Sequence, residues 1–179
     1  MKLRSSSLPT RLLCLGLMWP MLATAHPGHD LGYGIAAGFA HPFTGLDHLF
    51  VMTAVGIWSA QLGGRARLLL PMGFLCCMLI GAGLAIANVR LPLSETMIAI
   101  SVAVLLAAIV LHVRPSTLAA TSLVSAFAVF HGYAHAVDMP SDVLAVRYMM
   151  GFTLATAALQ ALGFALETFA MRLEATRAR

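Results

Sequence analysis

The chain has 179 residues, of which 60% are hydrophobic and only 10% are charged, and its mean hydropathy is +0.88. Several stretches are long and apolar enough to span a lipid bilayer, which excludes an ordinary soluble protein and indicates an integral membrane protein of one domain. The net charge of +4 does not indicate nucleic-acid binding, because the arginines are scattered between apolar segments and not clustered on a polar surface.

The first segment, 1–25, has the pattern of a secretory signal peptide. A basic start is followed by the apolar run LLCLGLMWPMLA and by the tripeptide Ala-Thr-Ala, which matches an A-x-A cleavage site. Cleavage after Ala25 would leave 26–179 as a polytopic transmembrane domain whose N-terminus lies outside. The new N-terminal sequence HPGHD is either a metal collector, through His26 and His29, or a solvated tail.

The rest of the chain predicts an all-α bundle of five or six transmembrane helices. A shorter apolar piece, 31–40, precedes five long ones, and short connections with glycine, proline or asparagine separate them. With the N-terminus outside, the cytoplasmic segments hold six arginines and the outer ones two, in agreement with the positive-inside rule. The five long predicted helices are 45–62, 68–87, 93–112, 117–137 and 147–168.

The stretch HPFTGLDH, which runs from His41 to His48, interrupts the first long apolar segment. On an unbroken helix the two histidines would stack, but Pro42 and Gly45 predict a break between them. We therefore expect a broken or re-entrant segment near Pro42. Transporters use such breaks to bring helix ends and backbone carbonyls to a substrate within the membrane.

In this topology the ionisable residues converge on the outer half of the membrane. His131 and His135 are four residues apart and share a helix face, which Asp138 continues. Imidazole nitrogens and carboxylate oxygens without thiolates suit a borderline divalent ion such as nickel, cobalt or zinc. The candidate metal ligands are His41, Asp47, His48, Glu95, His131, His135 and Asp138.

Each of these residues also has a purely structural interpretation. Thr44 and Asp47 fit a capping box at a helix start, and Glu95 would complement a helix dipole. Buried histidines can hydrogen-bond across helices for packing. The pair His131 and His135 on one helix face favours a functional interpretation, because burying two imidazoles in an apolar helix costs free energy.

Two other classes of protein compete with a transporter. A metal-dependent intramembrane enzyme would use the paired histidines, but Gly132 stands where the H-E-x-x-H pattern has its general base, and no G-x-S-x-G motif is present. We therefore expect no enzymatic activity. A structural membrane subunit would use its polar residues to join helices, and His-to-Ala changes would then lower the amount of protein and not a specific activity.

Two motifs connect the chain to a known family. His41 with Asp47-His48, followed by VGIWSAQLGGRA, and the later segment FHGYAH resemble the HupE/UreJ family of nickel and cobalt permeases. The resemblance runs from about His29 to Gly163 and includes LPLSE around Glu95.

The resemblance implies a secondary permease that imports Ni²⁺ or Co²⁺ as substrate, with no permanently bound cofactor. It implies that the functional polar residues are His41, Asp47, His48, Glu95, His131 and His135. It also suits the bacterial inner membrane, with the N-terminus periplasmic and the C-terminus cytoplasmic. The chain departs from the family pattern at Ala136 and Asp138, where glycine and glutamate are usual, and at Gln160, where relatives often carry histidine. These departures bear on the choice of metal.

Overall fold

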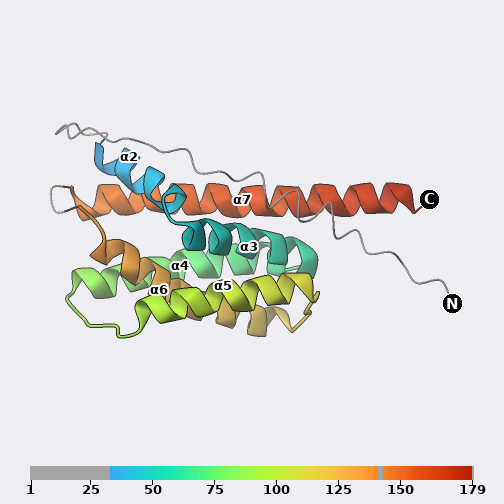
Figure 1. The fold of residues 1–179 in the computed structure, drawn as a ribbon, viewed down its shortest axis with the longest axis horizontal. Helices are drawn as coiled ribbons and strands as arrows, with labels where there is room; N and C mark the ends of the chain where they lie inside the picture. Colours follow the sequence, from blue (N-terminus) through green and yellow to red (C-terminus); the bar gives the residue numbers. More distant parts are fainter. Residues whose placement is uncertain (1–32, 141–142, 179) are drawn as a thin grey trace.

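The computed structural model describes residues 33–140 and 143–178, and every regular element in this part of the chain is a helix (Figure 1). The predicted signal peptide lies outside the described residues. The elements are α2 (Tyr33–Ala40), the short 3₁₀ helix η1 (His41–Phe43), α3 (Leu46–Leu62), α4 (Ala66–Ile86), α5 (Ser94–Val110), α6 (Thr117–Val137) and α7 (Ala145–Arg177).

Several helix boundaries coincide with proline or capping residues in the sequence. The predicted break near Pro42 is confirmed, because α2 ends at Ala40 and α3 begins only at Leu46. The start of α6 is fixed by Ser116, whose hydroxyl accepts a hydrogen bond from the Ala119 N–H at 3.2 Å. The five long helices match their predicted ranges closely, except that α7 continues well beyond the predicted end at 168.

The composition of the helices is that of a membrane protein. Within the described residues, α4, α6 and α7 are each long and apolar enough to cross a bilayer, and α5 is a shorter apolar helix of 17 residues. Because a span needs about 20 apolar residues, with a range of roughly 17 to 25, five or six spans remain a prediction that counts α5 and the broken α2–α3 segment.

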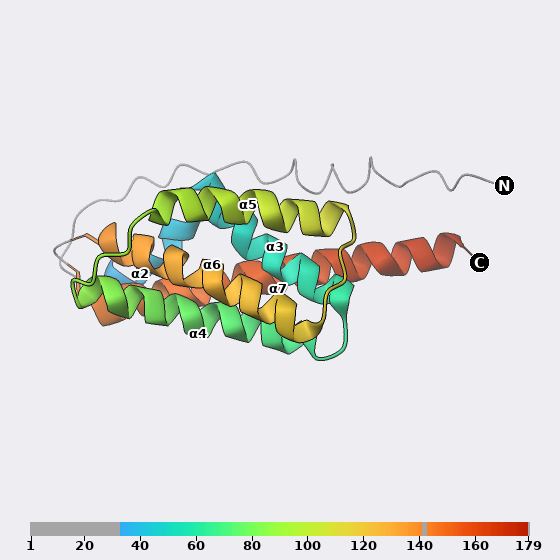
Figure 2. The ribbon, with the colours of Figure 1, turned by 90° about the horizontal axis from the view of Figure 1, so that it is seen from below.

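The helices form two sets that run along the same axis. One set is α7 with α2 and α3 against it, and the other is α4 with α6; α5 packs on α3 and α6 (Figure 2). Within α4 and α6, Gly73 faces Thr121 while Gly81 faces Val129, so the two helices run parallel. The end of α6 and the starts of α2 and α7 lie at one end of the bundle, which we call the histidine end (Figure 2).

Three reciprocal glycine pairs allow the parallel helices to approach closely. A Cβ atom on either member of a pair would collide with a backbone carbonyl oxygen of the partner helix. Small residues permit such approach in membrane proteins, where apolar burial gives helices little reason to associate. The pairs are Gly38 with Gly151, Gly56 with Gly163, and Gly81 with Gly132.

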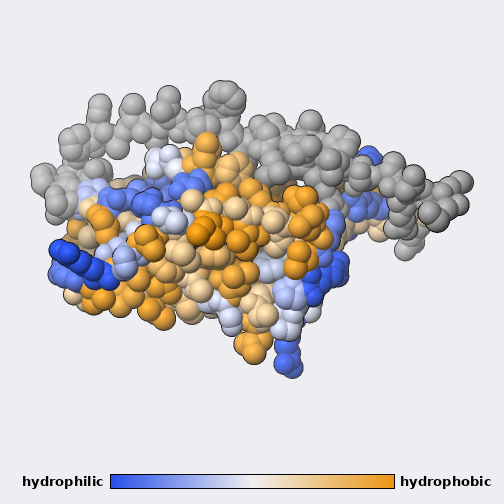
Figure 3. Space-filling view, turned by 60° about the horizontal axis from the view of Figure 1, so that its bottom comes forward, coloured by the Kyte–Doolittle hydropathy of each residue, from blue (hydrophilic) through white to orange (hydrophobic). Residues whose placement is uncertain are grey.

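The outer surface is consistent with contact with lipid. Figure 3 shows apolar residues over the middle of the visible face and hydrophilic residues gathered toward its ends. Many large apolar side chains are exposed on the surface. In a soluble protein they would promote aggregation, whereas in a bilayer they would contact the lipid hydrocarbon. The most exposed include Leu68, Leu118, Val146 and Phe169.

We expect Gly81→Ala to destabilise the protein, because its Cβ would meet the Val129 carbonyl oxygen. Overpacking of this kind costs about 1–3 kcal/mol. Gly83 is the matched control on the same helix, since a Cβ atom added there would have no neighbour within 4 Å and alanine is the better helix former. Thermal unfolding in detergent should show a lower midpoint for Gly81→Ala only. Equal midpoints would mean that the α4–α6 contact is looser than described.

Candidate functional site

The break between α2 and α3 positions the first two histidines. The Thr44 hydroxyl donates to the His41 carbonyl oxygen at 2.7 Å, and the Thr44 N–H donates to the same oxygen at 3.0 Å. These two bonds close the turn after His41. The capping box considered for Asp47 is not formed, because the N-cap of α3 is Gly45 and no side chain caps the helix.

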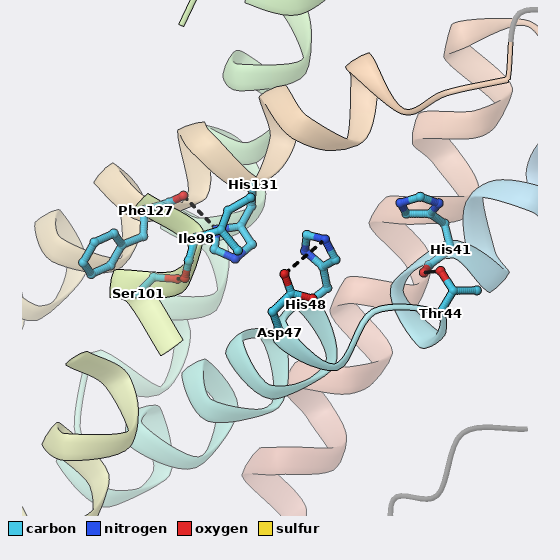
Figure 4. Close-up of polar contacts among 8 residues, drawn as sticks. All are labelled: His41, Thr44, Asp47, His48, Ile98, Ser101, Phe127 and His131. Carbon is cyan, nitrogen blue, oxygen red and sulfur yellow. Dashed lines mark hydrogen bonds and ion pairs between the residues drawn. The ribbon is translucent and has the colours of Figure 1, made fainter. Parts of the chain in front are cut away.

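Gly45 leaves room for the side chains that follow it. A Cβ at this position would lie 2.8 Å from His48 Cδ2 and 2.9 Å from a carboxylate oxygen of Asp47. His48 Nε2 lies 3.9 Å from Asp47 Oδ2, which makes an ion pair only when the imidazole is protonated. Figure 4 shows His48 between His131 and His41, with Asp47 beside it. A side chain at position 45 would therefore displace those of Asp47 and His48, whereas the backbone angle of Gly45 is open to any residue.

The histidines of α6 are fully buried. His131 Nδ1 lies 2.9 Å from the Phe127 carbonyl oxygen, one turn earlier on the same helix. A carbonyl can only accept, so Nδ1 carries the proton and, in the neutral ring, Nε2 keeps its lone pair. Nε2 of His131 is buried without a hydrogen-bond partner. One nitrogen therefore orients the ring and the other is left free for a ligand.

The structure brings all four predicted histidines of the two motifs together, and we call them the histidine cluster: His41, His48, His131 and His135. The His135 ring centroid is 4.0 Å from that of His48 and 4.8 Å from that of His41. The His48 and His131 centroids are 5.7 Å apart. Nδ1 of His48 and both nitrogens of His135 are also buried without hydrogen-bond partners.

Aromatic side chains enclose the cluster, and sequence reasoning missed them. The Phe152 ring centroid is 3.9 Å from that of His135, the Tyr148 centroid is 5.8 Å from that of His41, and Phe74 contacts His131 from α4. Tyr148 and Phe152 are one turn apart at the start of α7. Their spacing was visible in the sequence, but an aromatic pair at this spacing is equally typical of ordinary helix packing.

Of the three predicted acidic ligands, Asp47 and Asp138 are near enough to the histidines to interact with them electrostatically. Asp138 follows the last residue of α6 and is exposed, yet it is near enough to His41 and His48 to interact with them electrostatically. Glu95 is exposed in the first turn of α5. The histidines are thus brought together, whereas Glu95 makes no ring contact or ion pair among the described residues.

The arrangement gathers metal-binding atoms without fixing them in a closed site. No group of three or more His, Cys, Asp or Glu side chains in residues 33–140 and 143–178 has the geometry of a metal site as it stands. Unpartnered nitrogens in an apolar interior cost free energy, so their presence calls for a ligand or a function. Chemically, the cluster can offer neutral imidazoles to a cation that enters from the histidine end.

The comparisons with known proteins agree with this geometry. The model of the family described as "HupE / UreJ protein" matches residues 13–179. The chain belongs to the HupE/UreJ family. Protein HupE from Rhizobium leguminosarum bv. viciae is 39% identical over 164 residues, which cover 92% of this chain and 84% of that protein. No solved structure shows significant similarity to the chain. The family suggested by the two histidine motifs is therefore confirmed, and both motifs supply the cluster.

We expect His135→Phe to stabilise the protein while it removes a candidate ligand. Both ring nitrogens of His135 are buried and unpartnered, and replacing such a group by an apolar ring of similar size should raise the free energy of unfolding by about 1 kcal/mol. His131→Phe is the matched comparison, because it also loses the bond to the Phe127 carbonyl oxygen. Thermal unfolding in detergent tests this; equal destabilisation by both changes would show that His135 serves packing.

Proposed function

We propose that this HupE/UreJ protein is a permease that imports divalent nickel, cobalt or both across the bacterial inner membrane. The observation that supports this best is the histidine cluster, in which four imidazoles from η1, α3 and α6 meet at one end of an apolar helix bundle with several nitrogens unpartnered. The proposal includes no permanently bound cofactor, because the metal ion is the transported substrate.

The ligand types narrow the substrate to a class. Imidazole suits nickel, cobalt, copper and zinc, whereas magnesium and calcium prefer oxygen ligands. The affinity order of divalent metals does not choose among the first group, and nickel and cobalt come from the resemblance of the two histidine motifs to the HupE/UreJ permeases. An open cluster fits cargo better than a permanently held ion, because a transported ion must also leave.

The membrane potential can drive import without nucleotide hydrolysis. The only lysine, Lys2, lies in the predicted signal peptide, so the sequence contains no Walker A loop. A divalent cation moving inward gains roughly 4.6 kcal/mol per 100 mV, twice the value for one charge. In the proposed orientation the histidine end faces the periplasm and the end of α7 faces the cytoplasm.

The competing classes fit the geometry less well. An enzyme of the H-E-x-x-H type needs a carboxylate next to its first histidine, but Gly132 packs against the Met78 carbonyl oxygen and leaves no space for a side chain. A structural subunit would use its buried histidines to hydrogen-bond between helices. His131 instead bonds within its own helix, and His135 has no hydrogen-bond partner.

We expect wild-type protein to accumulate trace nickel or cobalt in a permease-deficient host, and His41→Ala and His131→Ala to lose this accumulation. Each change removes one imidazole from the cluster, and loss of a ligand or of its support lowers metal affinity or activity roughly 10- to 100-fold. The measurement is initial uptake of radioactive metal at matched membrane abundance.

His112→Ala is the control for that experiment, because His112 follows α5 at the end of the bundle opposite to the cluster. Its uptake should equal that of the wild type. No uptake of either metal by the wild type, or normal uptake by His41→Ala and His131→Ala, would contradict the permease.

Uptake should also fall as the outer pH is lowered. Imidazole must be neutral to bind metal, so protons compete with the metal once the pH falls below the pKa of the ligating histidines. Proteoliposomes with a fixed potassium diffusion potential separate this effect from changes in driving force. A rate that does not fall at any acidic pH at which the protein stays folded would argue against imidazole ligation.

A further inference from the structure

A second buried polar site lies at the other end of α3 and α7. Gln61 Nε2 donates to Glu167 Oε1 at 3.1 Å, and the two residues are only 7% and 8% exposed. Glu167 is the only buried carboxylate among the described residues. A carboxylate inside a membrane protein is costly enough to indicate a function.

The position of this pair relates it to the histidine cluster. Because α3 rises about 1.5 Å per residue, Gln61 lies roughly 20 Å along the helix from His48. On α7, Glu167 lies about 22 Å along the helix from Phe152, which contacts His135. The two polar sites are thus separated by roughly 20 Å along both helices, about two thirds of the thickness of the hydrocarbon core.

Buried polar groups lie along α3 and α7 between the two sites. Thr156, Gln160 and Glu167 occupy one face of α7, at the four- and seven-residue spacings of a helix face. Gln160 is 2% exposed, and both atoms of its side-chain amide are without hydrogen-bond partners. On α3, the Thr53 hydroxyl is likewise buried and unpartnered. Gln160 and Thr53 lie where α3 and α7 touch, because the Gln160 carbonyl oxygen faces Gly56 and the Thr53 carbonyl oxygen faces Gly163.

We propose that the Gln61–Glu167 pair is the inner cation site of the permease, which receives the ion that enters at the histidine cluster and releases it to the cytoplasm. This proposal rests on the proposed function. The geometry favours it because Gln61 Oε1 is buried without a partner while the Nε2 of the same amide contacts the Glu167 carboxylate. Rotation of the amide would turn Oε1 toward the carboxylate and offer a cation two types of oxygen.

The chemistry of the two sites suits the direction of transport. Imidazole nitrogen holds nickel or cobalt ions better than amide and carboxylate oxygens do, so the inner site binds the ion more weakly than the cluster. Conduction needs sites that attract the ion and also let it go. A single carboxylate offsets part of the charge of the ion at the exit without holding it permanently.

A role limited to joining the helices explains the pair less well. The α3–α7 contact already has the close backbone approach at Gly56 and Gly163. A neutral amide pair would supply the same hydrogen bond without a buried charge. The substitution Glu167→Gln makes that replacement, because it keeps the shape and an acceptor for Gln61 but removes the charge.

The test compares nickel uptake by wild type, Glu167→Gln and Gln61→Met in a permease-deficient host, with each rate divided by the amount of inserted protein. Both changes should lower the initial rate roughly tenfold or more. The full-length purified proteins should still bind nickel at the histidine cluster with wild-type affinity. Glu174→Gln is the matched control, since it neutralises an exposed carboxylate farther along α7 and should leave uptake unchanged.

His131→Ala, measured in parallel, separates the two proposals. Normal uptake by Glu167→Gln and Gln61→Met, while His131→Ala is inactive, would overturn the inner site and leave the permease intact. Loss of nickel binding in Glu167→Gln would also overturn it, because the effect would then be on the cluster and not on the exit. Absence of uptake by the wild type would remove the proposed function and the inner site with it.

Discussion

Contact between helix backbones at glycine is the constraint on which the rest of this bundle depends. Apolar side chains gain little by leaving lipid for a protein interior, so helix association relies on close van der Waals packing. The three reciprocal pairs, which join α2 and α3 to α7 and α4 to α6, supply that packing in each of the two parallel sets. The register set by these contacts determines which side chains meet elsewhere.

The histidine cluster is a product of this register. Gly38 and Gly151 align α2 with the start of α7, so that the broken segment delivers His41 beside Tyr148. Gly132 lies directly after His131 and locks α6 against α4, which keeps both α6 histidines in the interior. The residues that pack the helices and those that could bind an ion thus alternate along the same segments, and a change in one set affects the other.

Much of this arrangement could be predicted from the sequence. Hydropathy predicted the five long helices, and Pro42 with Gly45 predicted the break, because apolar length and proline chemistry act locally. Which histidines meet was expected from topology, but the distances between them depend on helix register, which hydropathy does not encode. The enclosing aromatics and the buried Gln61–Glu167 pair were missed for the same reason, since a glutamate near the end of the last helix is equally typical of a solvated turn.

The length of α7 has a mechanical consequence. It is an uninterrupted helix of 33 residues without proline, and it projects beyond the other helices in both views (Figures 1 and 2). Near its start it touches the ring of His135 through Phe152, and farther along it carries Glu167. By contrast, the chain opposite to it is divided between α2 and α3. Because α7 has no break, a displacement of one end of this helix would move the other end with it, whereas the facing chain changes direction at Pro42.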